Sequence, residues 1–171
     1  MSKQFFYKIL LQFTQNASIP SKDDSILLTL ALTHNLTVGE LASDCLLLNC
    51  VKGYFHIIGG WNSVCYDHHY RISPTGDAWE AMRPYPLKIV HHVGVVDGMT
   101  GRIYVFGGHS CSTYRAHAYY YKVETDNWVR IEDLPWTSVN TAASIIKQKD
   151  GSRWIVLASP KGRLNKYFEL G

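Results

Sequence analysis

Several patterns that mark chemical function do not occur in this sequence. It has no CxxC pair and no cysteine–histidine cluster at zinc-site spacing, which excludes the common structural zinc motifs. It also has no phosphate-binding loop, GxSxG elbow, HExxH helix or dinucleotide fingerprint, so the enzyme classes built on them leave no signature. The apolar patch from Phe5 to Phe13 is interrupted by Lys8 and is too short to span a membrane.

Charge is also scarce. The net charge is +3, and the arginines are scattered along the chain, so no nucleic-acid or membrane surface is predicted. A charged fraction of 18% with 46% hydrophobic residues describes a folded globular protein with one core. Aromatic residues, at 13% with eleven Tyr and five Trp, are abundant and favour a β-rich fold.

One pattern that is present occurs twice: an apolar strand that ends in two glycines and is followed by a spaced Tyr and Trp. The spacing between the copies lies in the range of propeller-blade repeats, about 40 to 50 residues. In the first copy the Tyr and Trp are further apart, with an insertion over 73–76. The copies are Tyr54–Ile58 with Gly59, Gly60, Tyr70 and Trp79, and Ile103–Phe106 with Gly107, Gly108, Tyr121 and Trp128.

This pattern resembles the kelch repeat, which implies an all-β fold of four-stranded propeller blades. The glycines would then accept positive φ and a close backbone approach, and the Tyr and Trp would fill the space between blades. We expect blades at about 41–86, 87–136 and 137–171. The third is degenerate, because Ala158 and Ser159 stand where the glycine pair should be. Residues 1–40 would be an N-terminal extension, either helical or the remnant of a preceding blade.

About three blades do not close a propeller ring, since kelch propellers usually have more. Three explanations are open: a fragment of a longer protein, a homo-oligomer that completes the ring between chains, or an open arc capped by the N-terminal segment. The absence of a Trp after Lys166 to Leu170 favours the fragment.

Two of the four cysteines, Cys65 and Cys111, each follow a glycine pair closely. Equivalent loops of adjacent blades could bring them together as a disulfide, but the low cysteine density favours two free thiols. The sequons at Asn16 and Asn35 matter only if the chain is secreted. The weak N-terminal signal slightly favours a cytoplasmic protein, with secretion as the alternative.

The loops after the glycine pairs are the best candidates for a partner surface, because exposed aromatic and Arg side chains on loops are typical contact anchors. The candidate residues are Trp61, Asn62, His109, Ser110, Tyr114 and Arg115. The histidine candidates for a metal, His68, His69, His91, His92, His109 and His117, are interpreted as structural, and no cofactor is predicted.

The resemblance implies a non-enzymatic module that binds a protein partner, such as actin or a ubiquitin-ligase substrate. The alternative is a fragment of a kelch-propeller enzyme, similar to galactose oxidase or a sialic-acid epimerase. That enzyme would need loop His and Tyr side chains to converge.

Overall fold

The computed structural model describes residues 46–73, 78–139, 141–158 and 164–171, and every regular element in these ranges is a β-strand. The predictions for residues 1–40 and the sequons at Asn16 and Asn35 therefore lie outside the described residues. In the described part no helix is long and apolar enough to cross a membrane. The fold is all-β, as the repeat pattern predicts.

The strands form three main antiparallel sheets and one small hairpin. We call the sheets blade 1 (order β1-β2-β5-β6), blade 2 (β10-β9-β8-β7) and blade 3 (β11-β12-β13). The hairpin β3-β4 belongs to the chain of blade 1. The strands are β1 (Leu46–Val51), β2 (Tyr54–Ile58), β3 (Trp61–Asn62), β4 (Val64–Cys65), β5 (His69–Ile72), β6 (Glu80–Ala81), β7 (Val93–Asp97), β8 (Arg102–Phe106), β9 (Ala118–Lys122), β10 (Asn127–Ile131), β11 (Ala142–Lys147), β12 (Arg153–Ala158) and β13 (Leu164–Leu170).

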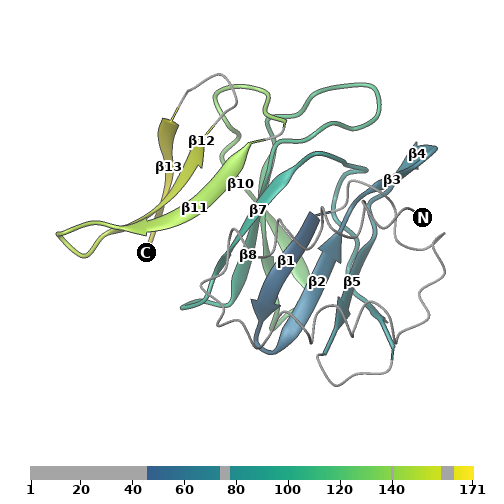
Figure 1. The fold of residues 1–171 in the computed structure, drawn as a ribbon, viewed down its shortest axis with the longest axis horizontal. Coiled ribbons are helices and arrows are strands. Elements are labelled where there is room, and N and C mark those ends of the chain that lie inside the picture. Colours follow the sequence, from purple (N-terminus) through teal and green to yellow (C-terminus); the bar gives the residue numbers. More distant parts are fainter. Residues whose placement is uncertain (1–45, 74–77, 140, 159–163) are drawn as a thin grey trace, which may run out of the picture.

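The three blades follow one another like successive blades of a propeller (Figure 1). The first strand of blade 2, β7, contacts the first strand of blade 1, β1, and the first strand of blade 3, β11. Asp97, at the end of β7, is buried and accepts a hydrogen bond from the Arg153 guanidinium, which ties blade 2 to blade 3.

One strand boundary differs from the sequence expectation. The pattern predicts a strand from His91 to Val96, but β7 begins at Val93. His91 has a φ of 53°, in the left-handed region, which is incompatible with an extended strand. The chain turns at His91, leaving this side chain exposed while His92 is buried.

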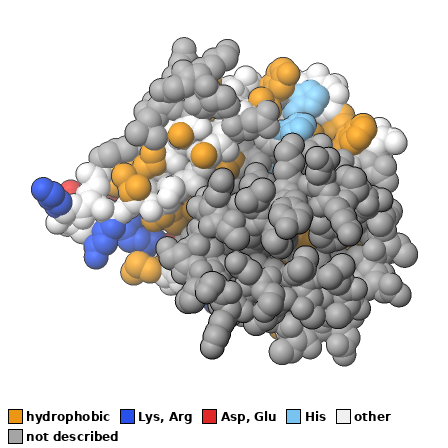
Figure 2. Space-filling model, in the orientation of Figure 1, with side chains coloured by type: hydrophobic (Ala, Val, Ile, Leu, Met, Phe, Trp, Pro, Cys, Tyr) orange, Lys and Arg blue, Asp and Glu red, His pale blue; other side chains and the backbone are white. Residues whose placement is uncertain are grey.

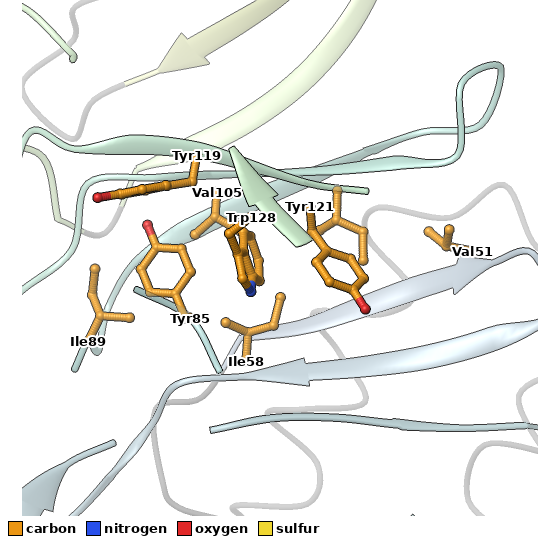
Figure 3. Close-up of a cluster of buried hydrophobic side chains, with 9 residues drawn as sticks. Val51, Ile58, Tyr85, Ile89, Val105, Tyr119, Tyr121 and Trp128 are labelled. Carbon is orange, nitrogen blue, oxygen red and sulfur yellow. The ribbon is translucent and has the colours of Figure 1, made fainter. Parts of the chain in front are cut away.

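Two hydrophobic cores fill the spaces between the blades. Between blades 1 and 2, the rings of Tyr85, Tyr121 and Trp128 stand between the two sheets (Figure 3), packed around Ile58. Tyr85 comes from the segment that connects the two blades, and its ring lies edge-on to Trp128, with centroids 4.9 Å apart. The second core contains Tyr104 and Phe106 of blade 2. Its partners across the interface are Ile155, Leu157 and Leu170 of blade 3.

The glycine pairs lie where each blade meets the segment leading to the next. The N–H of Gly60 donates to the Ile89 carbonyl at 2.9 Å, and that of Gly108 donates to the Ser138 carbonyl at 2.6 Å. All four glycines have positive φ; for the first of each pair, Gly59 and Gly107, φ is 65° and 63°. A Cβ on Gly107 would lie 2.4 Å from the Ser138 carbonyl oxygen. The pair therefore lets the next connecting segment dock against the blade.

The Tyr and Trp of blade 2 reach the segment that follows blade 1. Trp128 Nε1 donates to the Arg83 carbonyl at 3.0 Å, and the Tyr121 hydroxyl donates to Asp126 Oδ1 at 2.7 Å. The Arg83 N–H donates to the same Asp126 oxygen at 2.8 Å. Burial opposes ionisation of Asp126, but the hydrogen bonds from Arg83 and Tyr121 outweigh it and lower the pKa of this carboxyl. These bonds connect the two blades through polar groups as well as packing.

A chain of two histidines enters the same network from blade 1. His69 Nδ1 lies 3.2 Å from the Arg83 carbonyl, which can only accept, so Nδ1 carries the proton. In the neutral ring, Nε2 of His69 then accepts from Nδ1 of His56 at 2.9 Å. Nε2 of His56 is buried and finds no hydrogen-bond partner among the described residues. The chain of bonds thus fixes both tautomers.

Three buried histidines at this interface are neutral at neutral pH. Burial lowers the pKa of His56 to about 3, with the nearby His69 and Arg71 acting in the same direction. Burial also lowers the pKa of His69 to about 4, although the hydrogen bond to Arg83 and the charge of Asp126 oppose it. Burial lowers the pKa of His92 to about 3. Each ring would pay a desolvation penalty if it became charged in place.

Removing the Tyr121 hydroxyl tests the network directly. The substitution Tyr121→Phe keeps the ring but deletes a donor to the Asp126 carboxylate, so we expect a loss of about 2 kcal/mol in the free energy of unfolding. Tyr114→Phe, at an exposed ring, is the matched control and should change the stability by less than about 0.5 kcal/mol. Urea denaturation of the three proteins measures both values. If Tyr121→Phe lost no more stability than the control Tyr114→Phe, the Tyr121 hydroxyl would contribute nothing to the interface.

Candidate loop surface

The loop after Gly60 forms a short hairpin that holds Trp61. Strand β3 pairs with β4 so that Trp61 lies opposite Cys65 and Asn62 opposite Val64, with Ser63 at the turn in the left-handed region (φ 63°). Directly opposed residues of an antiparallel pair share one face, so the Trp61 ring and the Cys65 sulfur lie on the same side of the hairpin. Sequence reasoning places Trp61 in a loop and does not predict this pairing.

The loop after Gly108 holds His109 and Tyr114 in a similar way. An isolated antiparallel bridge joins His109 to Tyr114, and their ring centroids are 4.9 Å apart. The Ser110 N–H donates to the Thr113 carbonyl at 2.9 Å, and Arg115 Nε donates to Ser110 Oγ at 3.0 Å. The Arg115 side chain therefore hydrogen-bonds within its own loop, whereas the Tyr114 ring is exposed to solvent.

The two loops are joined covalently. The structure differs here from the expectation of free thiols: Cys65 and Cys111 form a disulfide with a Cα–Cα distance of 5.8 Å, inside the usual range for such bonds. The physical reason is the hairpin, which presents Cys65 to the equivalent loop of the next blade. The His109 end of its own loop is also fixed, by backbone bonds with Val90 in the segment that leads into β7, at 3.0 and 2.8 Å. We call these two joined loops, residues 61–65 and 109–115, the loop surface.

The loop surface exposes large apolar side chains. Trp61 is 44% exposed, Val64 53% and Tyr114 58%. Hydrophobic and histidine side chains lie next to one another at the upper right of Figure 2, on the side where Figure 1 has the β3-β4 hairpin. Neither segment of the loop surface contains an acidic residue. Sequence reasoning does not include Val64, which pairs with the predicted Asn62, among the candidate residues. It considers the Cys65–Cys111 disulfide but favours free thiols.

The other predicted histidines do not converge on a metal. His68 stacks on Tyr66 with centroids 4.6 Å apart, and His117 Nδ1 lies 3.3 Å from an Asp133 carboxylate oxygen. His69 and His92 are in the blade interface. Within the described ranges, no three His, Cys, Asp or Glu side chains gather in a way that could hold a metal ion.

The arrangement of strands defines a protein built from propeller-type repeats. Comparison with protein families identifies the repeat: residues 95–135, which cover most of blade 2, match the family model of the Kelch motif. The chain thus contains a kelch repeat, in blade 2. No curated protein matches it in sequence.

Among solved structures, the chain is similar to a fungal alcohol oxidase described as having catalytic diversity among the AA5 family, in complex with copper. The TM-score is 0.50 and the sequence identity 13%, over 69% of this chain and 27% of the oxidase. This chain therefore spans less than a third of the length of that structure. A likeness at this identity shows a shared fold, and function has to be argued from the site.

Proposed function

We propose that this chain is a non-enzymatic interaction module that binds a partner protein through the loop surface. The observation that carries the proposal is the combination of exposure and rigidity. Trp61 and Tyr114 project from loops that are held by a disulfide and by backbone bonds, so their rings are presented without a large ordering penalty on binding. Aromatic anchors of this kind dominate many protein interfaces.

The enzyme alternative receives less support from the same surface. It needs loop His and Tyr side chains to converge on one site. The described loops contain two such contacts, His109 with Tyr114 and His68 with Tyr66, and they lie in separate loops. The other side chains on the loop of residues 109–115 are Ser, Thr and Arg side chains, which are not the ligands that copper prefers, and Cys111, whose sulfur is held in the disulfide and is not a thiolate. That the partner is actin or a ubiquitin-ligase substrate stays a prediction from the family resemblance, and a second copy that completes the propeller ring stays a separate prediction.

Photo-crosslinking tests the loop surface as a binding site. A benzophenone amino acid placed at Tyr114 should give a discrete adduct with a cellular protein. The same probe at Met99 is the control, because Met99 is 79% exposed but lies in the β7–β8 turn, at the opposite end of blade 2. Equal adducts from both positions would indicate nonspecific contact.

The captured protein, once purified, provides the quantitative test. We expect Trp61→Ala and Tyr114→Ala each to weaken its binding by about 30-fold or more, the effect of losing an aromatic anchor worth about 2 kcal/mol. Met99→Ala should leave the affinity unchanged. If neither loop substitution changes the affinity, the partner binds elsewhere and the proposed site is wrong.

A further inference from the structure

The Cys65–Cys111 disulfide joins two blades without being part of either core. The strands of blades 1 and 2 are held by their own backbone ladders, and the interface between them by the core around Tyr85, Tyr121 and Trp128. The disulfide lies beyond the glycine pairs, in the loops. Opening it would therefore leave the blades folded and act on the loops.

The disulfide attaches the segment from Ser110 to Tyr114 to the β3-β4 hairpin of blade 1. Several hydrogen bonds that shape the segment run within the loop, from Ser110 to Thr113 and from Ser112 to Ser110. Cys111 itself has a φ of 59°, a left-handed conformation that a non-glycine residue adopts only where its surroundings hold it. When the covalent link opens, Cys111 is free to leave that conformation.

The two cysteine residues differ in exposure. Cys111 is exposed, whereas Cys65 is 4% exposed and its sulfur lies 4.0 Å from the His109 carbonyl oxygen. An incoming thiolate reaches the Cys111 residue first, because thiol–disulfide exchange requires direct attack on a sulfur atom. Exposed disulfides are also the ones that cellular thiols reduce most readily.

We propose that the Cys65–Cys111 disulfide is a reversible redox clamp that sets the affinity of the loop surface for its partner. This inference rests on the proposed function, since the clamp regulates that same surface. In the oxidised form, Tyr114 is held beside the Trp61 hairpin and both anchors are presented together. In the reduced form, the loop 109–115 moves independently of blade 1, and binding must order it again.

The exchange step balances with a thiol reductant such as glutathione. A first thiolate attacks the Cys111 sulfur, forms a mixed disulfide and releases Cys65 as a thiolate, which takes up a proton. A second glutathione thiolate attacks the glutathione sulfur of that mixed disulfide and releases Cys111, which is protonated in turn. The protein gains two electrons and two protons, and two glutathione molecules become one glutathione disulfide.

The first measurement asks whether the clamp is reversible. The folded chain is incubated with reduced glutathione in excess, free thiols are alkylated, and the mass increase at Cys65 and Cys111 is located by peptide mapping. We expect both residues to become alkylated while the circular dichroism of the blades is unchanged, and glutathione disulfide to reverse the reaction. If the bond opens only after unfolding in denaturant, it is a permanent structural link and the proposal is overturned.

The second measurement asks whether the clamp orders the loop. Amide hydrogen exchange of peptides covering 109–115 should become at least about tenfold faster on reduction, because the loop opens locally more often when the disulfide no longer holds it. The double variant Cys65→Ser, Cys111→Ser should show the fast exchange in both conditions and no response to glutathione. Unchanged exchange in the reduced wild-type chain would mean that the loop is held without the disulfide, which contradicts the proposal.

The third measurement links the clamp to binding and separates it from the proposed function. The probe is the protein captured by the benzophenone at Tyr114, and its affinity for oxidised chain, reduced chain and the double Ser variant is compared. We expect reduction and the double variant each to weaken binding about tenfold, a change of about 1.4 kcal/mol. Equal affinities in all three forms would overturn the clamp and leave the binding site standing. If Tyr114→Ala does not weaken binding of the captured protein to any of the three forms, the proposed function fails. The proposal that the disulfide controls partner affinity then fails with it.

Discussion

The variant Gly107→Ala is expected to lose about 2 to 5 kcal/mol of unfolding free energy, a large share of the stability of a typical domain. Two effects add. The left-handed φ of 63° costs a residue with a Cβ about 1 to 2 kcal/mol. The new Cβ would also lie 2.4 Å from the Ser138 carbonyl oxygen, so the segment leading to blade 3 must move, at about 1 to 3 kcal/mol.

Gly151→Ala is the matched control for this prediction. Gly151 also has a positive φ, of 89°, but a Cβ there meets nothing within 4 Å. The control therefore carries the backbone strain without the collision, and we expect a loss of only about 1 to 2 kcal/mol. Urea denaturation of both variants gives the difference. Similar losses for the two would show that the close approach of Ser138 is unimportant, and that glycine is needed at 107 for its φ alone.

Acid is expected to destabilise this protein steeply below about pH 6.5, the ordinary pKa of histidine. The pKa values of His56, His69 and His92 in the folded chain are lowered to about 3, 4 and 3. Above about pH 6.5 these rings are neutral in both the folded and the unfolded chain, so they add nothing to the pH dependence of stability there. As the pH falls from there toward the folded pKa values, only the unfolded chain takes up the protons, and stability is lost. Each ring contributes about 2 kcal/mol of loss by pH 5.

The unfolding free energy measured from pH 7.5 to 4.5 tests this slope. The double variant His56→Gln, His69→Gln removes two of the three buried histidines that take up a proton when the chain unfolds in acid. Its baseline stability is lower, but its dependence on pH should be shallower than that of the wild-type chain. The comparison of slopes does not depend on the baseline. Parallel slopes in the two proteins would mean that the two rings are not kept neutral by the blade interface.

Much of the fold follows from local patterns in the chain. Short apolar strands that end in glycine pairs predict the blades, because a strand and a sharp turn are both encoded by nearby residues. The described sheets and the Kelch match over 95–135 agree with that prediction of an all-β repeat fold. The boundary at His91 is not predictable in the same way, since a positive φ at a non-glycine residue has no signature in the local sequence, and here it lies between buried Ile89, Val90 and His92.

The site depends more on contacts between distant residues. Trp61 and Tyr114 are recognisable as loop aromatics, but their presentation on two joined loops depends on the pairing of Cys65 with Cys111, across a separation of 46 residues. Cysteine density, which favours free thiols, averages over the chain and carries no information about two facing loops. The histidine chain from His56 to Arg83 is likewise invisible in the sequence, because its members come from two strands and a connecting segment.

The contacts of Trp128 and Tyr121 show that the sequence repeat and the structural unit that it stabilises do not have the same boundaries. These residues close the motif of blade 2, yet their polar atoms reach Arg83, directly or through Asp126, in the segment after blade 1. A recombination event or a designed truncation that cuts between motifs would thus leave Arg83, at the exit of blade 1, without its hydrogen-bond partners: the donor Trp128 and the acceptor Asp126. Exchange of blades between proteins is best made with the 124–128 turn of the following repeat carried along. The residues that must be kept together to preserve stability are therefore those on the two sides of a junction between blades.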